Sequence, residues 1–490
     1  MRHYRHWIDG AQRSSTDGHL TRANPATGLL VAEFAEGTAA DVEAAVRAAK
    51  TCFSGSWPAL AASERSLLLH RWADRLEATL EHLSRIESEE SGKPIRIARG
   101  EVGWCVEMTR FAAALTMNVH GEAFTNLGND RLGLVTREPV GVVGMIVPWN
   151  YPLVCLFQKL PFALAAGCTT VIKPSEMTSS TAIEIASLAA EVGVPAGAIN
   201  VVTGKGAVVG DALVRHTDVA MISFTGSTQV GRQIARTVGD RVGRIALELG
   251  GKAANIVFAD ADLDAAVDGV LFGFTLNQGE ECAAGTRLLV EQSIHEVFVE
   301  MLRERVRRIQ IGDTQDERTD VGALISKAHL DRVLSYIESG RSEGATVACG
   351  GHRLLKPPYD AGYFVDATVF TNVTPSMRIF REEIFGPILT VTPFRDADHA
   401  VELANDTAYG LANGLWTRDV DKVHQVSRRL RSGTVYVNTY LETAVQMPFG
   451  GYKDSGVGRE LGLDALRAFT ETKSVFLKMG PRAPAFPDKT

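Results

Sequence analysis

The chain has 490 residues, of which 45% are apolar, and a formal net charge of −7. Two or three domains are expected because the length exceeds what one hydrophobic core supports, and the apolar fraction excludes disorder. The acidic balance argues against nucleic acid or an anionic membrane as the main partner. No apolar run is long enough to span a bilayer and the N-terminus lacks a secretory signal, which makes the cytoplasm the simplest location.

The N-terminal part of the chain is predicted to hold short strands and then helices. Short β-rich runs and turns fill residues 1–36. Apolar residues at helical spacing predict helices over 41–53 and 63–91, and a further helix is expected to end near residue 118. Residues 121–137 lose this spacing, so we expect extended chain there.

From residue 138 short β-rich runs alternate with helical segments, which predicts an α/β fold with a mostly parallel, doubly wound sheet. Strands are expected at 141–147, 169–172, 199–202, 219–224, 244–247 and 254–258, and helices at 154–165, 180–192, 207–215 and 229–238. The alternation continues with strands at 287–291, 365–370 and 433–438 and helices at 296–310 and 327–343. Such sheets bind ligands outside the carboxyl ends of their strands.

The six cysteines are scattered without a C-x-x-C pair, so neither a zinc site nor a disulfide framework is predicted. Cys282 differs from the others because it lies among small and polar residues between Gly279 and Gly285. Small neighbours leave room for a substrate beside the sulfur and let backbone N–H groups point at it. Cys282 is therefore a candidate nucleophile. This stretch alone leaves open a buried structural cysteine.

A glycine turn at residues 223–231 places Gly226 and Gly231 across a predicted strand-to-helix junction. The N-terminus of a helix attracts phosphate groups. The spacing differs from the usual G-x-G-x-x-G dinucleotide fingerprint, so a plain helix start capped by Ser227 or Thr228 is an equal alternative.

Lys173 and Glu176 follow another predicted strand. An amine and a carboxylate at that place can hold ribose hydroxyls, and the carboxylate disfavours a 2′-phosphate. The pair predicts NAD rather than NADP. Use of NADP stays open, because Lys173 could accept a phosphate if Glu176 swings away. A solvated pair of loop residues is the non-functional alternative.

Seven motifs stand in the order in which they occur in aldehyde dehydrogenases, a family that the chain resembles over nearly its whole length. These motifs are Pro148–Pro152 (PWNYP), Lys173–Glu176 (KPSE), Phe224–Ser227 (FTGS), Leu247–Gly251 (LELGG), Gln278–Cys282 (QGEEC), Glu383–Pro387 (EIFGP) and Pro448–Lys453 (PFGGYK). Each motif alone is modest evidence, but seven in this order are poorly explained by chance.

The resemblance implies an aldehyde-dehydrogenase-like fold: two doubly wound, Rossmann-like parallel-sheet domains and a small β arm for oligomerisation. It implies an NAD-binding domain in 1–120 and 139–249 and a catalytic domain in 250–469. The arm and the C-terminal tail would occupy 121–138 and 470–490. Thr470–Leu477 alternates and is β-branched, as expected of an edge strand. In the family such a strand joins a neighbour's sheet, so a homodimer or homotetramer is implied.

The resemblance also implies an oxidoreductase that converts an aldehyde into the carboxylic acid with NAD. Cys282 would add to the aldehyde, and the Asn150 amide and the Cys282 N–H would hold the oxyanion of the thiohemiacetal. Hydride transfer to the nicotinamide would leave a thioester, and Glu248 would activate water for its hydrolysis. Lys159 and Glu460 match a buried pair that relays protons in some relatives, although a structural ion pair is an equal alternative.

Two further sets of residues take their roles from the resemblance. Cofactor contacts are expected at Pro148, Trp149, Lys173, Ser175, Glu176, Gly206, Gly226, Ser227, Gly231, Leu249, Gly250, Glu383 and Phe385. The substrate pocket is expected to be lined by Trp104, Tyr151, Gln158, Glu281, Leu441, Thr443 and Phe449.

Glu281 departs from the family's pattern, because the residue before the nucleophile is usually not acidic. A carboxylate there would raise the pKa of the Cys282 thiol and slow its attack, unless it faces away or is paired. It could instead receive a cation, together with the ring faces of Trp104 or Tyr151. Gln158 is polar where several relatives carry a large aromatic residue. We therefore hypothesise a pocket that tolerates polar or positively charged aldehydes, such as amino- or trimethylammonio-aldehydes.

Two other functions stay open. One is a dehydrogenase that passes its thioester to coenzyme A, and Glu248 argues against it because transfer to a thiol needs no hydrolytic base. The other is a non-catalytic dinucleotide-binding protein in which Cys282 is idle. The presence of a candidate nucleophile, amide and base argues against this second function.

Overall fold

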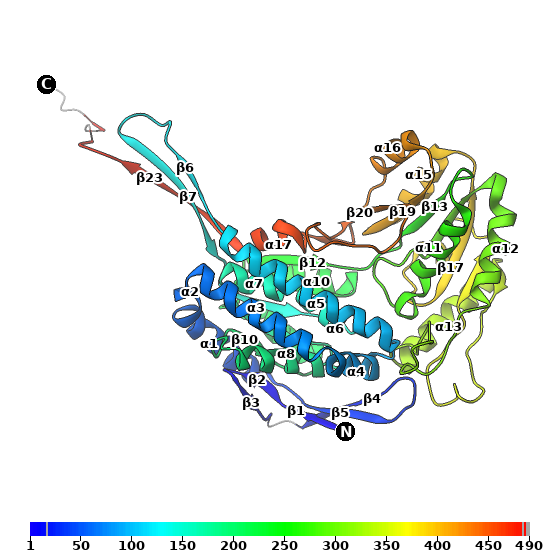
Figure 1. Cartoon of the computed structure of the whole chain (residues 1–490), viewed down its shortest axis with the longest axis horizontal. Helices are drawn as coiled ribbons and strands as arrows, with labels where there is room; N and C mark the ends of the chain where they lie inside the picture. Colours follow the sequence, from blue (N-terminus) through cyan, green and yellow to red (C-terminus); the bar gives the residue numbers. More distant parts are fainter. Residues whose placement is uncertain (16–17, 483–484, 487–490) are drawn as a thin grey trace.

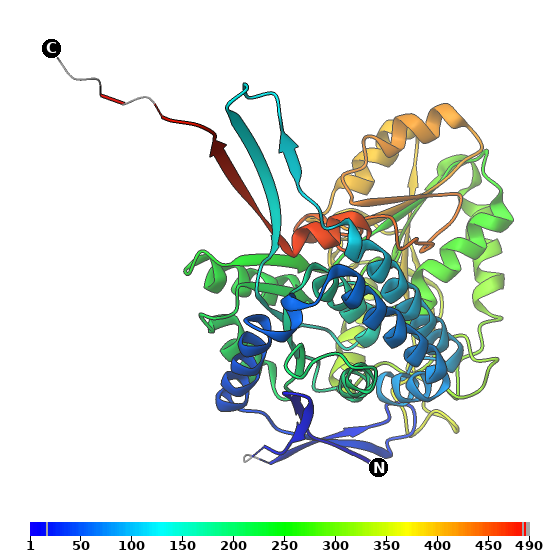
Figure 2. The same cartoon turned by 60° about the vertical axis from the view of Figure 1, so that its left-hand side comes forward.

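A computed structural model describes residues 1–15, 18–482 and 485–486. Figures 1 and 2 show two α/β bodies side by side, with a narrow arm that projects away from them. No helix in the described part of the chain is long and apolar enough to cross a membrane.

The first body is built on an eight-stranded sheet with the order β22-β12-β11-β8-β9-β10-β2-β3. Its five central strands run parallel, which confirms the predicted doubly wound sheet. They are β8 (Val142–Ile146), β9 (Thr169–Lys173), β10 (Ile199–Val201), β11 (Met221–Thr225) and β12 (Arg244–Glu248). The antiparallel edge strands are β2 (His6–Ile8), β3 (Ala11–Arg13) and β22 (Gly456–Val457).

Helices cover both faces of this sheet. Both faces are apolar, because successive side chains of β8 point to opposite faces and all of them are buried. Val143 and Met145 enter one apolar core, whereas Val142 and Ile146 enter the other. The first core includes α3 (Ala62–Ala78), α4 (Leu80–Ser91), α5 (Ile95–Leu115), α6 (Pro152–Phe157), α7 (Leu160–Ala166), α8 (Ser180–Glu191) and α17 (Gly462–Ala468). The second includes α1 (Ala39–Phe53), α9 (Asp211–Arg215) and α10 (Thr228–Gly239). A small sheet of β1 (Arg2–Tyr4), β4 (His19–Ala23) and β5 (Leu30–Ala35) lies beside this body.

The second body holds a seven-stranded sheet that is antiparallel only at β15. The order is β15 (Thr346–Cys349), β16 (Thr368–Thr371), β17 (Ile388–Phe394), β14 (Arg287–Glu291), β13 (Ala254–Val257), β19 (Ala412–Trp416) and β20 (Thr434–Val437). One face packs on α13 (Lys327–Ser342), α14 (Arg378–Arg381), α15 (Ala397–Asn405) and α16 (Val420–Ser427), and the other on α11 (Leu263–Thr275) and α12 (His295–Val306). The chain passes from the first sheet to the second between β12 and β13; the predicted domain boundaries stay a prediction.

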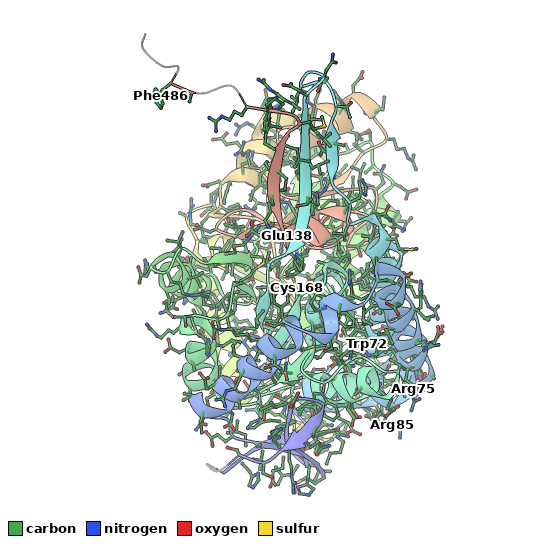
Figure 3. The ribbon with its side chains drawn as sticks, turned by 90° about the vertical axis from the view of Figure 1, so that its left-hand side faces the viewer. Trp72, Arg75, Arg85, Glu138, Cys168 and Phe486 are labelled. Atoms are coloured by element: carbon green, nitrogen blue, oxygen red, sulfur yellow. The ribbon has the colours of Figure 1, made fainter. Side chains whose placement is uncertain are left out.

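The arm is a three-stranded antiparallel sheet of β6 (Glu122–Phe124), β7 (Arg131–Pro139) and β23 (Thr470–Lys478). β23 pairs with β7 along its full length and forms an edge, as predicted. In Figure 3 the arm rises above the body, with Glu138 near its foot. Part of the predicted C-terminal tail, residues 483–484 and 487–490, lies outside the described residues.

Two predicted helices are wrong in detail. The helix predicted over 63–91 is two helices, since the Thr79 hydroxyl donates to Arg75 O (2.9 Å) at the break and competes with the helix. The helix predicted over 154–165 is also divided, because Pro161 has no N–H to donate to the preceding turn. The helix predicted over 207–215 is confirmed, although its first part belongs to a π-helix, Gly206–Gly210, that precedes α9.

Candidate active site

Cys282 lies between α11 and β14, after a tight turn formed by residues 276–279. Asn277, Gln278 and Gly279 all have positive φ (51°, 58° and 71°), which turns the chain sharply. Gly279 is required there, because a Cβ atom would lie 2.3 Å from the backbone of Gly386. The turn carries Cys282 from the second body toward the carboxyl ends of the first sheet's strands.

Two cavities meet at Cys282. The first has a volume of about 310 Å³ and the second about 270 Å³, and they share Cys155, Glu248 and Cys282. All seven residues expected to form a substrate pocket line the first cavity: Trp104, Tyr151, Gln158, Glu281, Leu441, Thr443 and Phe449. The second cavity is lined by Asn150, Leu249, Gly250, Glu383 and Phe385, among others.

A third cavity of about 720 Å³ continues from the second along the ends of β8, β9 and β11. It is lined by eight of the residues expected to contact the cofactor: Pro148, Trp149, Lys173, Ser175, Glu176, Gly206, Gly226 and Ser227. Gly231 lines none of the three cavities. Its lack of a side chain makes room for Leu249 instead, since a Cβ atom would lie 2.5 Å from Leu249 Cδ2.

The second and third cavities together fit a dinucleotide. The N-terminus of α10 faces the crevice, with Ser227 as its cap and Gly226 in the preceding turn. Lys173 Nζ and Glu176 Oε2 are 3.0 Å apart at the end of β9, where ribose hydroxyls would lie. Glu383 accepts the Gly251 N–H (3.0 Å), and burial raises the pKa of its carboxyl group to about 7.

The Cys282 thiol faces the carboxylate of Glu281. Cys282 Sγ donates to Glu281 Oε1 at 3.3 Å, and the Ala283 N–H donates to the same oxygen at 3.0 Å. The pKa of the Cys282 thiol is raised well above its usual value by burial and then by the carboxylates of Glu248 and Glu281. The side chain of Glu281 thus turns toward the sulfur rather than away from it.

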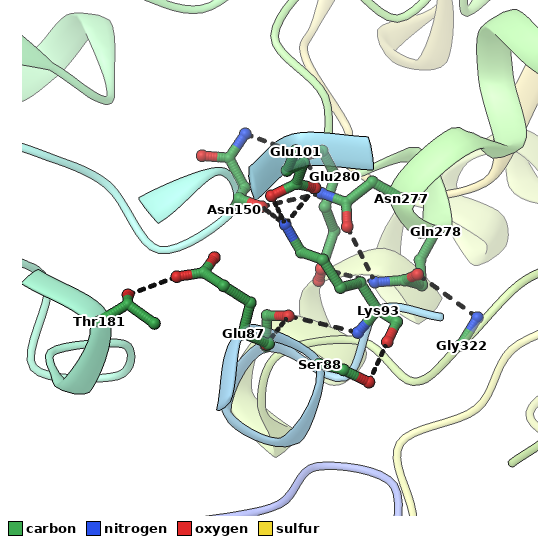
Figure 4. A network of polar contacts seen from close by, with 11 residues as sticks. Glu87, Ser88, Lys93, Glu101, Asn150, Thr181, Asn277, Gln278, Glu280 and Gly322 are labelled. Atoms are coloured by element: carbon green, nitrogen blue, oxygen red, sulfur yellow. Dashed lines mark hydrogen bonds and ion pairs between the residues drawn. The ribbon is translucent and has the colours of Figure 1, made fainter. Parts of the chain in front are cut away.

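Both the side-chain amide and the backbone carbonyl of Asn150 form hydrogen bonds, as Figure 4 shows. Its side-chain Nδ2 donates to Glu280 O (2.9 Å), and its backbone carbonyl accepts from Lys93 Nζ (2.8 Å) and from Asn277 Nδ2 (3.0 Å). Lys93 is completely buried and also donates to both oxygens of Glu101 (2.5 and 2.6 Å). A primary amide has two N–H donors, and Glu280 takes one of them.

Glu248 ends β12 and is 3% exposed. Its Oε1 atom is buried without a hydrogen-bond partner among the described residues. Burial and the negative charge of Glu460 raise the pKa of the Glu248 carboxyl well above its usual value, while Lys159 opposes this shift. Lys159 Nζ pairs with Glu460 and donates to Thr225 Oγ1 (2.6 Å), and neither Lys159 nor Glu460 lines the three cavities.

Residues 452–458 contain two short strands that pair with neighbouring segments. β21 (Tyr452–Lys453) pairs with β18 (Tyr409–Gly410), and β22 pairs with β12. Ser455 fixes the segment beside the site, because its hydroxyl donates to Gly250 O (2.7 Å) and its carbonyl accepts the Leu249 N–H (2.9 Å).

Sequence reasoning missed several residues of these cavities. Cys155 lines both the first and the second cavity, beside Cys282. His329 lines the second cavity and packs edge-on against Trp149, with ring centroids 5.3 Å apart. Arg332 and Tyr436 line one cavity each. Helical spacing could have found Cys155, which lies one turn after Tyr151, whereas no local pattern marks the others.

The comparisons with known proteins agree on one family. Residues 12–475 match the family model described as the aldehyde dehydrogenase family. Betaine aldehyde dehydrogenase of Bacillus subtilis is 42% identical, with 97% of this chain and 98% of that protein covered. The NADP/NAD-dependent aldehyde dehydrogenase PuuC of Escherichia coli is 41% identical, with 96% and 95% covered. The crystal structure of an NAD-dependent aldehyde dehydrogenase from Sinorhizobium meliloti has a TM-score of 0.97 at 43% identity, with 99% and 96% covered.

Proposed function

The chain belongs to the aldehyde dehydrogenase family, and we propose that it oxidises an aldehyde to the carboxylic acid with NAD through a thioester on Cys282. One observation carries the proposal: Cys282 and Glu248 lie together where a small cavity meets the dinucleotide-shaped crevice. A nucleophile and a base are thus placed between the two reactants.

The residues divide the chemistry among them. Cys282 adds to the aldehyde carbon, and the Asn150 amide with the Cys282 N–H holds the oxyanion of the thiohemiacetal. Bound NAD supplies the hydride acceptor that turns this adduct into a thioester. Glu248 then takes a proton from the water that hydrolyses the thioester, and Lys159 with Glu460 carries the proton away from Glu248.

The crevice favours NAD over NADP. The Glu176 carboxylate, paired with Lys173, lies where a 2′-phosphate would come and repels it. We expect a preference for NAD with residual use of NADP, because Glu176 is partly exposed and its side chain can move.

The Cys282→Ala variant tests the proposed function. NADH formation with any aldehyde should be abolished, while NAD binding should stay close to that of the parent because Cys282 is only one residue of the crevice lining. Acid release from the parent without coenzyme A would separate hydrolysis from acyl transfer. Turnover in Cys282→Ala, or a requirement for coenzyme A, would contradict the proposal.

We further propose that the substrate is a polar or positively charged aldehyde. Glu281, Gln158 and the rings of Trp104 and Tyr151 all line the first cavity, which supports a site for a cation. Trimethylammonio-acetaldehyde and its neutral isostere 3,3-dimethylbutanal measure the charge preference as a ratio of kcat/KM. In the parent, kcat/KM should be higher for the cationic aldehyde than for the neutral one, and this ratio should fall in Glu281→Gln. An equal ratio in the parent and the variant would contradict the proposal.

We also propose a homo-oligomer, dimer or tetramer, joined through the arm. β23 leaves one strand edge of the arm unpaired within the described chain, and an exposed edge favours pairing with a second copy. All six cysteines are free, which fits a reducing compartment such as the cytoplasm.

A further inference from the structure

The carboxylate of Glu281 forms a hydrogen bond with the Cys282 sulfur. Its Oε1 atom accepts both the thiol proton at 3.3 Å and the Ala283 N–H at 3.0 Å. The hydrogen bond from the Ala283 N–H holds the carboxylate in place. The backbone therefore positions the carboxylate beside the sulfur. Glu281 also lines the first cavity, where the aldehyde must enter.

A negative charge beside a thiol disfavours the thiolate, which is the reactive form. The other groups near this sulfur do not compensate for the charge. Lys159 is paired with Glu460, and Lys93 is held by Glu101 and the Asn150 carbonyl. The titratable groups that interact with Cys282 or Glu281 are Glu101, Tyr151, Cys155, Glu248, Tyr436 and Tyr440.

We propose that Glu281 holds the Cys282 thiol protonated and unreactive until a positively charged aldehyde enters the cavity and takes the carboxylate as its partner. The inference rests on the proposed function and deepens it, because it makes the substrate's charge part of the activation of the nucleophile. When the cation of the aldehyde offsets the negative charge of Glu281, the thiol can lose its proton to solvent. The sulfur then adds to the aldehyde carbon, while the carbonyl electron pair moves to oxygen. Glu281 would be a specificity-determining residue that acts on the chemical step as well as on binding.

Such coupling is reciprocal by thermodynamic linkage. A bound cation favours the thiolate, and the thiolate in turn strengthens binding of the cation. A small cation that cannot react should therefore make Cys282 more nucleophilic. A merely structural Glu281 would show no such effect.

Alkylation of Cys282 by iodoacetamide, followed by peptide mass spectrometry on the full chain, measures this effect. Tetramethylammonium is the probe, sodium chloride matches its ionic strength, and neopentyl alcohol is the neutral control. In the parent at pH 7, tetramethylammonium should accelerate alkylation about tenfold or more, corresponding to a thiol pKa lowered by about one unit, whereas neopentyl alcohol should not.

The Glu281→Gln variant should already react about 10- to 100-fold faster than the parent and should not respond to tetramethylammonium. Its amide oxygen can still accept the Ala283 N–H, so the turn is retained. Glu442→Gln is the charge-matched control, because Glu442 is exposed and lines none of the three cavities. It should keep the parent's rate and its response.

Two outcomes would overturn the inference: a parent rate that tetramethylammonium leaves unchanged, or a Glu281→Gln rate equal to or below that of the parent. The first of these needs no variant, so it does not depend on how Glu281→Gln folds. Failure of the proposed function is recognised separately, since it shows as turnover in Cys282→Ala, whatever the alkylation rates are.

Discussion

At the scale of single residues, burial disfavours the charged forms of three groups at the site. The thiol of Cys282 and the carboxyls of Glu248 and Glu383 have raised pKa values in which desolvation is the largest cause. A buried general base with a raised pKa is a stronger base once it is ionised, so the shift suits Glu248 to hydrolysis.

The raised pKa of Glu248 sets the pH dependence of thioester hydrolysis. The carboxylate is the active form, and it is lost as pH falls through a pKa that lies well above the usual carboxyl range. Hydrolysis, measured as steady-state turnover after the NADH burst, should rise with pH across a range above that of an ordinary carboxyl group and then reach a plateau. A rate already constant from about pH 5 upward, as an ordinary carboxyl would give, would contradict this account.

Residue types and motif order in the sequence were enough to name the thiol, the amide and the carboxylate that meet at the two cavities. Their chemical roles stay predictions. The residues that support them could not be predicted, because Lys93 contacts Asn150 across 57 positions and Asn277 does so across 127. No local pattern records such a contact. The orientation of Glu281 could not be predicted either, because it depends on hydrogen bonds from Cys282 Sγ and the Ala283 N–H.

At the scale of elements, the Lys93 network joins the start of α5, the loop after β8 and the turn before Cys282. Lys93→Met would leave Glu101 buried without its partner, which costs about 3 kcal/mol of unfolding free energy. We do not expect a larger loss, because burial already raises the pKa of Glu101 to about 8, so the unpaired carboxyl group can take up a proton. Chemical denaturation measures the loss.

Two controls accompany the Lys93 variant. Lys327→Met removes an exposed pair with Asp331 and should cost no more than about 0.5 kcal/mol. Adding Glu101→Gln to Lys93→Met should recover part of the stability, since it removes the unpaired charge. Equal losses for Lys93→Met and Lys327→Met would show that the network does not stabilise the fold.

The turn after β12 is built around the absence of a side chain at Gly250. A Cβ atom there would lie 2.5 Å from Glu383 Oε2 and would displace the carboxylate. Gly250→Ala should therefore weaken NAD binding about tenfold, or by about 1.4 kcal/mol, in a fluorescence titration. Gly239→Ala is the matched control because its Cβ would meet no atom within 4 Å. Equal NAD affinity in the two variants would disprove this role for Gly250.

The spacing of apolar residues predicted most helices and strands but not the breaks within two of the helices. The breaks at Thr79 and Gln158 depend on single side-chain or proline effects inside otherwise helical patterns. The pairing of β22 with β12 could not be predicted, because it joins residues about 200 positions apart and spans only two residues. Strands buried on both faces, such as β8, were recognisable as short continuous apolar runs.

At the scale of the whole molecule, the arm projects away from both bodies (Figure 1). Phe476 on β23 is 66% exposed and Phe124 on β6 is 43% exposed. Such a surface on a projecting sheet with a free edge suits contact with a second copy of the chain.

Replacing Phe476 by Asp should therefore shift the oligomer toward smaller species in analytical ultracentrifugation, because it buries a charge in the contact. Leu67→Asp is the control, since Leu67 is 51% exposed on α3, which is not part of the arm. If both variants sediment like the parent, the arm is not the contact.

In the proposed mechanism, the two bodies and the cavities between them bring one sulfur, one carbonyl carbon and one hydride acceptor together. The most direct measurement uses Glu248→Gln, which retains the proposed nucleophile but lacks the proposed hydrolytic base. Mixing it with aldehyde and NAD should give one equivalent of NADH per chain and, by peptide mass spectrometry, one acyl group on Cys282. One equivalent of NADH with no acyl group on Cys282 would contradict the account.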